Sequence, residues 1–125
     1  MYFLSWLAAF VAMGILDTVW VMINSRCGIY KDHVGVARGR LFIVVAWVLM
    51  LATEASLVSV MVRSTSSFEK ATLMGALAGL TIYVVFNGTT LVMDAKWPVS
   101  TALLDTCWGT ILNAIGAIMA LLAVQ

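Results

Sequence analysis

Residues 41–62 read LFIVVAWVLMLATEASLVSVMV, a run of apolar side chains in which Glu54 is the one charged residue. An α-helix rises about 1.5 Å per residue, so a run of this length crosses the roughly 30 Å hydrocarbon core of a bilayer. Three comparable stretches occupy residues 3–23, 71–93 and 99–124. The sequence therefore predicts four transmembrane helices.

The composition of the whole chain supports this prediction. Of its 125 residues, 63% are hydrophobic and 10% charged, and the mean hydropathy is +1.06. An ordinary soluble domain is about half apolar and about a quarter charged. Because the connections at 24–40, 63–70 and 94–98 are too short for a separate domain, we expect residues 1–125 to form one all-α membrane domain, an antiparallel four-helix bundle with short loops.

The distribution of charge predicts an orientation and restricts the partners. The net charge is +1, and the basic residues are spread over three loops, which argues against nucleic acid and leaves the lipid bilayer as the expected partner. Positive residues gather on the cytoplasmic side of membrane proteins. We therefore expect both termini on the non-cytoplasmic side, because the first and third loops hold five basic residues against two in the second: Arg26, Lys31, Arg38, Arg40 and Lys96 against Arg63 and Lys70.

Small residues mark the faces on which the predicted helices pack. Gly75 and Gly79 form a GxxxG pattern, which lets two helix backbones approach closely in lipid. The same face continues through Tyr83 to Asn87 at steps of four residues, and the last span places two small residues, Gly109 and Gly116, seven positions apart on one face. These five packing positions predict close helix contacts: Gly75, Gly79, Tyr83, Gly109 and Gly116.

The string L-D-T-x-W occurs in the first and in the last span. It contains Asp17 and Trp20 in one copy and Asp105 and Trp108 in the other. In an antiparallel pair, residues at one level have a constant sum of residue numbers, and Asp17 with Trp108 gives the same sum as Trp20 with Asp105. One register therefore places each carboxyl group beside the indole N–H of the opposite helix.

Acidic side chains inside the spans are candidates for function. A charge near the bilayer centre costs a few kcal/mol, and no Lys or Arg lies within a predicted span to neutralise Asp17, Glu54 or Asp105. One interpretation is a polar site of Asp17, Asn87 and Asp105 for a proton, a cation or a small polar headgroup, walled by Trp20 and Trp108. The other is interhelical hydrogen bonding that only fixes the packing. We assign Glu54 to packing, because it stands alone and nearer the opposite membrane face.

The remaining reactive side chains predict no metal or cofactor. His33 is the one histidine, and Cys27 and Cys107 are placed in a loop and in a span, which suits neither a disulfide nor a metal site. The sequence has no Walker motif, no dinucleotide-binding fingerprint, no H-E-x-x-H motif and no nucleophile elbow. Trp97-Pro98 precedes the last span, where Trp suits the bilayer interface and Pro the first helical turn.

Several of these strings together resemble one protein family. D-x-x-W late in the first span, Ile29-Tyr30-Lys31, Trp97-Pro98 and Asp105-x-x-Trp108-Gly109 are similar to the small membrane proteins grouped as domain of unknown function 2177. The resemblance covers nearly the whole chain and implies a four-helix membrane fold. Members typically carry Y-D-x-T-N before their Trp-Pro, where this chain has Asn87 in place of the carboxylate.

Three functions fit these observations. The first is a membrane module whose site of Asp17, Asn87 and Asp105 binds or conducts a small polar ligand, an ion or a proton. The second is an accessory subunit of a larger membrane complex or a homo-oligomer. The third is a membrane-embedded enzyme acting on a lipid, with an aspartate as acid or base, although Asn87 argues against catalysis.

Overall fold

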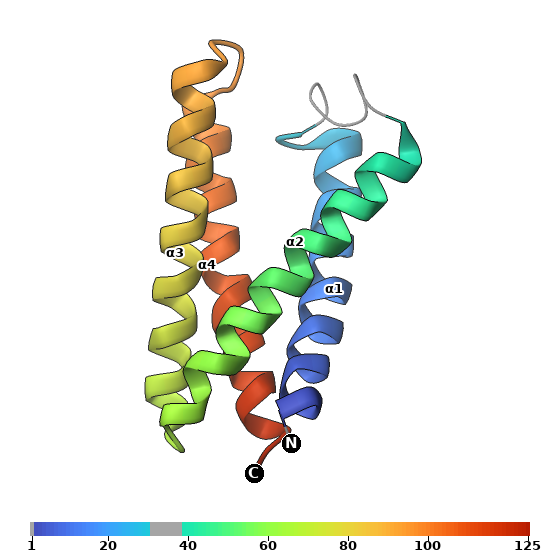
Figure 1. Ribbon diagram of the computed structural model, residues 1–125. Coiled ribbons are helices and arrows are strands. Elements are labelled where there is room, and N and C mark those ends of the chain that lie inside the picture. The colour runs from blue at the N-terminus through green and yellow to red at the C-terminus, as the bar shows by residue number, and fades with distance from the viewer. Residues whose placement is uncertain (1, 31–38) are drawn as a thin grey trace.

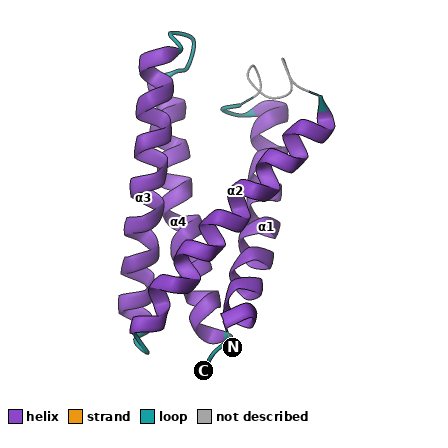
Figure 2. Ribbon diagram, in the orientation of Figure 1, coloured by secondary structure: helices purple, strands orange, loops and turns teal. Residues whose placement is uncertain are grey.

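The computed structural model describes residues 2–30 and 39–125 and has four long helices among them (Figure 1). Coil is confined to the connections and the chain ends (Figure 2). All four helices are long and apolar enough to cross a membrane, as the sequence predicts. The predicted residues Lys31, His33 and Arg38 and the side chain of Cys27 lie outside the described part. The elements are α1 (Tyr2–Cys27), α2 (Arg40–Met61), the short 3-10 turn η1 (Val62–Ser64), α3 (Phe68–Met93) and α4 (Val99–Leu122).

The helix ends differ from the predicted spans by a few residues because polar residues extend the helices beyond the apolar runs. α1 continues to Cys27 and carries Arg26 in its last turn, where a cation suits the helix dipole. α3 begins at Phe68, where the Ser67 side chain accepts a hydrogen bond from the Lys70 backbone N–H. Such a cap satisfies one of the free N–H groups of the first turn.

The chain turns back at each connection, so that both ends of the chain lie at the same end of the bundle (Figure 1). α3 and α4 lie side by side and make the most extensive helix contact, and α1 packs against α4. α2 crosses α1 obliquely and approaches α3 mainly near the end where η1 lies (Figure 1). The two halves of the molecule, α1 with α2 and α3 with α4, therefore diverge toward the other end.

Glycines bring α3 and α4 into close contact. A Cβ atom added at Gly79 would lie 2.2 Å from the carbonyl oxygen of Gly109, and one at Gly75 would lie 2.4 Å from that of Asn113. At Gly109 the same atom would meet the ring of Tyr83 at 2.1 Å. At Gly75 and Gly79 the obstacle is backbone, so no side chain fits there without movement of α4, whereas at Gly109 the ring of Tyr83 would have to move. At Gly116 the neighbour is the flexible side chain of Met13 from α1, which covers the glycine.

Large apolar side chains cover the outside of all four helices, among them Val19, Leu41, Val85 and Leu103. The exposed hydroxyl groups of Thr53, Thr72, Thr81 and Thr90 each donate to the backbone carbonyl four residues earlier in the same helix. This bond removes the cost of placing a hydroxyl group in hydrocarbon. The outer surface is therefore suited to lipid, whereas Asp17, Asn87, Asp105 and Asn113 are buried.

Candidate functional site

A cavity of about 370 Å³ lies between the two halves of the molecule, toward the end where they diverge. Three carboxyl side chains from three helices line it: Asp17 of α1, Glu54 of α2 and Asp105 of α4. Among the described residues that line it there is no Lys, Arg or His. The other lining residues are the aromatic Tyr30, Trp47, Tyr83, Phe86 and Trp97 and the aliphatic Val21, Met50 and Ile82.

Asp17 is held by two tryptophans from two other helices. Trp108 Nε1 donates to its Oδ1 at 2.8 Å, and Trp47 Nε1 donates to its Oδ2 at 2.6 Å. The aspartate is only 3% exposed. The predicted contact of Asp17 with Trp108 is therefore confirmed, and Trp47 is a partner that the sequence reasoning missed. Indole is a donor only, so both bonds suit a carboxyl group that acts as acceptor.

The predicted contact of Trp20 with Asp105 is wrong. Trp20 Nε1 donates instead to the hydroxyl oxygen of Tyr30 at 2.9 Å, and that hydroxyl donates to Asp105 Oδ1. The reason is that Trp20 stacks flat on Trp108, with ring centroids 4.6 Å apart and an interplanar angle of 4°. The stack keeps α1 and α4 adjacent, and the tyrosine hydroxyl bridges Trp20 to the carboxyl group.

Tyr30 reaches this position from the segment after α1. The backbone N–H of Tyr30 donates to the Asn24 carbonyl at 3.0 Å, and that of Ile29 donates to Asn24 Oδ1 at 3.4 Å, so that the chain turns back over the helix end. Burial raises the pKa of the Tyr30 phenol, and its hydrogen bond to Asp105 raises the pKa further. The phenol therefore stays protonated and acts as a donor.

Asn87 holds the other oxygen of Asp105. Its Nδ2 donates to Asp105 Oδ2 at 2.8 Å and to the Tyr83 carbonyl at 3.0 Å, and its Oδ1 accepts from Trp97 Nε1 at 3.1 Å. Trp97, which the sequence suggested as an interface anchor, thus turns inward and lines the cavity. Pro98 is the N-cap residue of α4, one position before the first helical turn.

Glu54 shares the cavity with the two aspartates, although the sequence reasoning placed it apart. Asn113 Nδ2 donates to its Oε2 at 2.9 Å, which is the interhelical bond that a packing role requires. No described donor meets hydrogen-bond geometry at its Oε1, although the Tyr83 hydroxyl interacts with this carboxyl group, and the side chain is only 3% exposed. Trp47 and Glu54 are seven residues apart, two helical turns, and this spacing is the signal that puts both on one face of α2.

The hydrogen bonds in this cluster come from neutral donors. Indole, phenol and amide groups satisfy the carboxyl oxygens of Asp17 and Asp105 but bring no positive charge. Over residues 2–30 and 39–125, no group of three His, Cys, Asp or Glu side chains lies close enough to hold a metal ion. The described part of the cavity therefore offers acidic groups and aromatic walls and contributes no basic side chain of its own.

The fold and this site define a class, that of integral membrane proteins with four membrane-spanning helices around an acidic cavity. The sequence profile of one family, described as predicted membrane protein (DUF2177), matches residues 2–122. The chain belongs to this family, as its motifs indicate. A comparison with curated proteins and one with solved structures each found no match.

Proposed function

We propose that the cavity binds or conducts a small positively charged species, a cation or a proton, within the membrane. The observation that carries the proposal is that Asp17, Glu54 and Asp105 line one cavity and that none of its described lining residues is basic. Acidic side chains inside a bundle are costly in lipid and are commonly part of ion or proton pathways. A bound cation would supply the charge that the neutral donors lack.

The three carboxyl groups differ in how well they suit this role. Both oxygens of Asp17 and of Asp105 already accept hydrogen bonds, which also fits a role in holding the helices together. Glu54 has one oxygen with no donor among the described residues and is buried. An unpaired buried acceptor costs about 1–3 kcal/mol, which a ligand can recover. Glu54 is therefore the group that we expect to contact the cation.

The experiment uses the purified full chain in lipid nanodiscs and in liposomes. Binding of Na⁺, K⁺, ammonium and alkylammonium ions is measured by calorimetry, and proton flux is measured with a pH-sensitive dye inside the liposomes. We expect at least one of these species to bind or to cross, and Glu54→Gln to abolish the effect. Glu69→Gln is the matched control, because Glu69 lies in the first turn of α3 and does not line the cavity.

Two results would overturn the proposal. One is the absence of binding and of flux for every species tested with a folded protein. The other is binding that Glu54→Gln and Glu69→Gln leave equally intact, because the cavity carboxyl group would then have no part in it.

The fully partnered Asp17 and Asp105 favour a second candidate, an accessory subunit whose polar cluster only fixes its shape. Its exposed apolar side chains would then pack against a larger membrane protein. This candidate predicts that the chain is purified in mild detergent with another protein in fixed stoichiometry. It also predicts that Asp17→Asn is tolerated once the complex has assembled, whereas a transport role predicts loss of function with assembly intact.

A further inference from the structure

We propose that the occupant of the cavity is an organic ammonium ion with an apolar body, and that Glu54 Oε1 accepts its ammonium group. The inference rests on the proposed function and names the ligand class. It is drawn from the walls of the cavity, from the state of the carboxyl oxygens, and from the place where α2 and α3 separate.

The walls of the cavity suit an apolar cation. Five of the eleven described lining residues are aromatic, Tyr30, Trp47, Tyr83, Phe86 and Trp97, and they come from both halves of the molecule. Aromatic faces attract ammonium groups by about 0.5–2 kcal/mol each, and aromatic cages are a common means of binding them. Val21, Met50 and Ile82 add aliphatic surface. A hydrated inorganic ion would gain little from such walls.

The oxygens of the cavity do not suit a metal ion. Both carboxyl oxygens of Asp17 and of Asp105 already accept hydrogen bonds from indole, phenol or amide donors. Ca²⁺ takes about 6–8 oxygen ligands. Glu54 Oε1 is the one carboxyl oxygen of these three side chains without a donor among the described residues, and it is buried. One free acceptor matches one ammonium N–H, and the bond would be charge-assisted.

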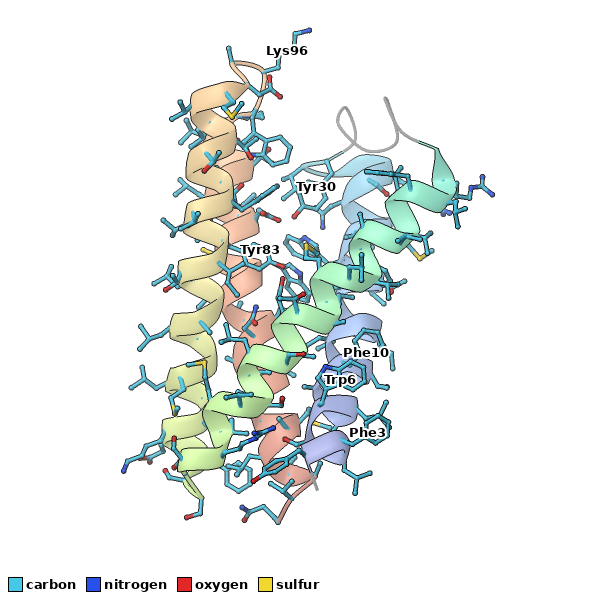
Figure 3. All side chains as sticks on the ribbon, in the orientation of Figure 1. Phe3, Trp6, Phe10, Tyr30, Tyr83 and Lys96 are labelled. Carbon is cyan, nitrogen blue, oxygen red and sulfur yellow. The ribbon has the colours of Figure 1, made fainter. Side chains whose placement is uncertain are left out.

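The arrangement of α2 and α3 offers access from the lipid. Both helices line the cavity, α2 with Trp47, Met50 and Glu54, yet they contact each other much less than α3 contacts α4. Figure 3 shows Tyr30 and Tyr83 in the space between the two halves of the molecule. An ammonium ion with an apolar body concentrates in the bilayer interface and can enter sideways between these helices, whereas a small inorganic ion has no such route through hydrocarbon.

The test compares two soluble probes on the full chain in nanodiscs. 2-Phenylethylammonium carries the charge and an aromatic body, and 2-phenylethanol keeps the body and one donor but lacks the charge. Binding is followed by calorimetry and by tryptophan fluorescence, since Trp47 and Trp97 line the cavity. We expect saturable binding of the ammonium ion alone, with a change in fluorescence.

Three variants locate the binding. Glu54→Gln should weaken the affinity at least about tenfold, the loss expected for one hydrogen bond to a charged group. Its amide can still accept from Asn113, so the helix contact is kept. Phe86→Leu removes an aromatic wall that makes none of the described hydrogen bonds and should weaken binding roughly three- to tenfold. Glu69→Gln should leave the affinity unchanged.

The outcomes separate this inference from the proposed function. If Na⁺, K⁺ or protons bind or cross in a Glu54-dependent way while 2-phenylethylammonium does not bind, the ligand class is wrong and the proposed function stands. If no cation binds or crosses, both fail. If 2-phenylethanol binds as tightly as the ammonium ion, the cavity recognises the apolar body alone and the inference is overturned. This comparison and Phe86→Leu remain decisive even where Glu54→Gln does not fold.

Discussion

Trp108 Nε1 donates a hydrogen bond of 2.8 Å to Oδ1 of Asp17 and so joins α4 to α1 inside the bundle. Trp47 holds the second oxygen of the same carboxyl group, so Asp17 connects three helices. Such bonds in membrane proteins contribute modestly, by about 0.6–2 kcal/mol each. The main effect of these hydrogen bonds is to fix the positions of the carboxyl groups around the cavity.

We predict that Asp17 and Trp108 are coupled in stability. Trp108→Phe keeps a ring to stack on Trp20 and removes the N–H, and Asp17→Asn puts amide hydrogens beside indole donors. Because the two changes affect one bond, the double variant should be more stable than the sum of the single losses predicts, by about 0.6–2 kcal/mol. The free energy of unfolding of each variant is measured in mixed micelles that contain increasing amounts of a denaturing detergent.

A second cycle provides the control. Trp6 Nε1 donates to Ser56 Oγ and to the Ala52 carbonyl, and none of the described hydrogen bonds joins it to Asp17. Trp6→Phe and Asp17→Asn should therefore be additive. Additivity of Trp108→Phe with Asp17→Asn would contradict the prediction.

We predict that Gly79→Ala is strongly destabilising and Gly88→Ala is not. The new Cβ at Gly79 would lie 2.2 Å from the backbone oxygen of Gly109, which cannot yield without moving α4. Overpacking of this kind costs about 1–3 kcal/mol. Gly88 lies in the same helix with nothing within 4 Å of its Cβ position, and alanine is the better helix former there. Equal melting temperatures for the two variants would remove the packing role of Gly79.

We predict that Tyr30→Phe lowers stability and changes its dependence on pH. At neutral pH the variant leaves Trp20 N–H and one oxygen of Asp105 unpaired, at a cost of about 1–3 kcal/mol. Burial, followed by the bond to Asp105, raises the pKa of Tyr30 in the folded protein. A raised pKa contributes stability that is complete below the unfolded value of about 10 and is lost as the pH rises above it.

The measurement compares unfolding of the wild type and of Tyr30→Phe at about pH 8 and about pH 11, on either side of the tyrosine value. The difference in stability between the two proteins should shrink at the higher pH. A difference that does not change with pH would show that the phenol proton has no part in the interaction.

The charges of the loops predict the orientation of the chain in the membrane. We expect the ends near Arg26, Arg40 and Lys96 to face the cytoplasm, from the excess of basic residues there. With Cys27 and Cys107 replaced by serine, Lys96→Cys should resist an impermeant thiol reagent added to intact cells. Lys70→Cys, at the opposite end of α3, should react. The reverse pattern would invert the assignment.

The sequence predicts the spans well because each carries its own signal. A run such as 41–62 is long and apolar regardless of its neighbours, and the string L-D-T-x-W fixes the level of Asp17 against Trp108 by counting. Nothing in the helical period says where the chain goes after α1, so the bridging role of Tyr30 was not predictable. Trp97 likewise resembles an interface residue, because Trp is common there, and its partner Asn87 lies ten residues earlier, within α3.

The placement of Glu54 shows the same limit in another way. Its interhelical bond to Asn113 agrees with the packing role assigned from the sequence. What the sequence did not show is that α2 crosses α1 obliquely and brings Glu54 to the cavity of the two aspartates. The spacing of Trp47 and Glu54 on one face of α2 was the available signal. A tryptophan in mid-span needs an acceptor for its N–H, but the spacing does not say which acid supplies it.

The last prediction concerns the position at which this chain departs from the family pattern. Asn87→Asp restores the carboxyl group that the family motif carries, beside an Asp105 whose Oδ2 now lies 2.8 Å from the Asn87 amide nitrogen. Two carboxylates at this distance cannot both be ionised, so the pair must share a proton. The variant should therefore be less stable than the wild type at about pH 8 and recover at about pH 5, where a proton is available.

The double variant tests the same bond in the reverse sense. Combining Asn87→Asp with Asp105→Asn exchanges the amide and the carboxyl group and keeps an acceptor for Trp97 and for Tyr30. It should restore most of the stability at both pH values. Unfolding of the three variants in mixed micelles gives the comparison. A single variant as stable as the wild type at the higher pH, or a double variant no better than the single one, would show that the hydrogen bond between these side chains does not hold α3 to α4.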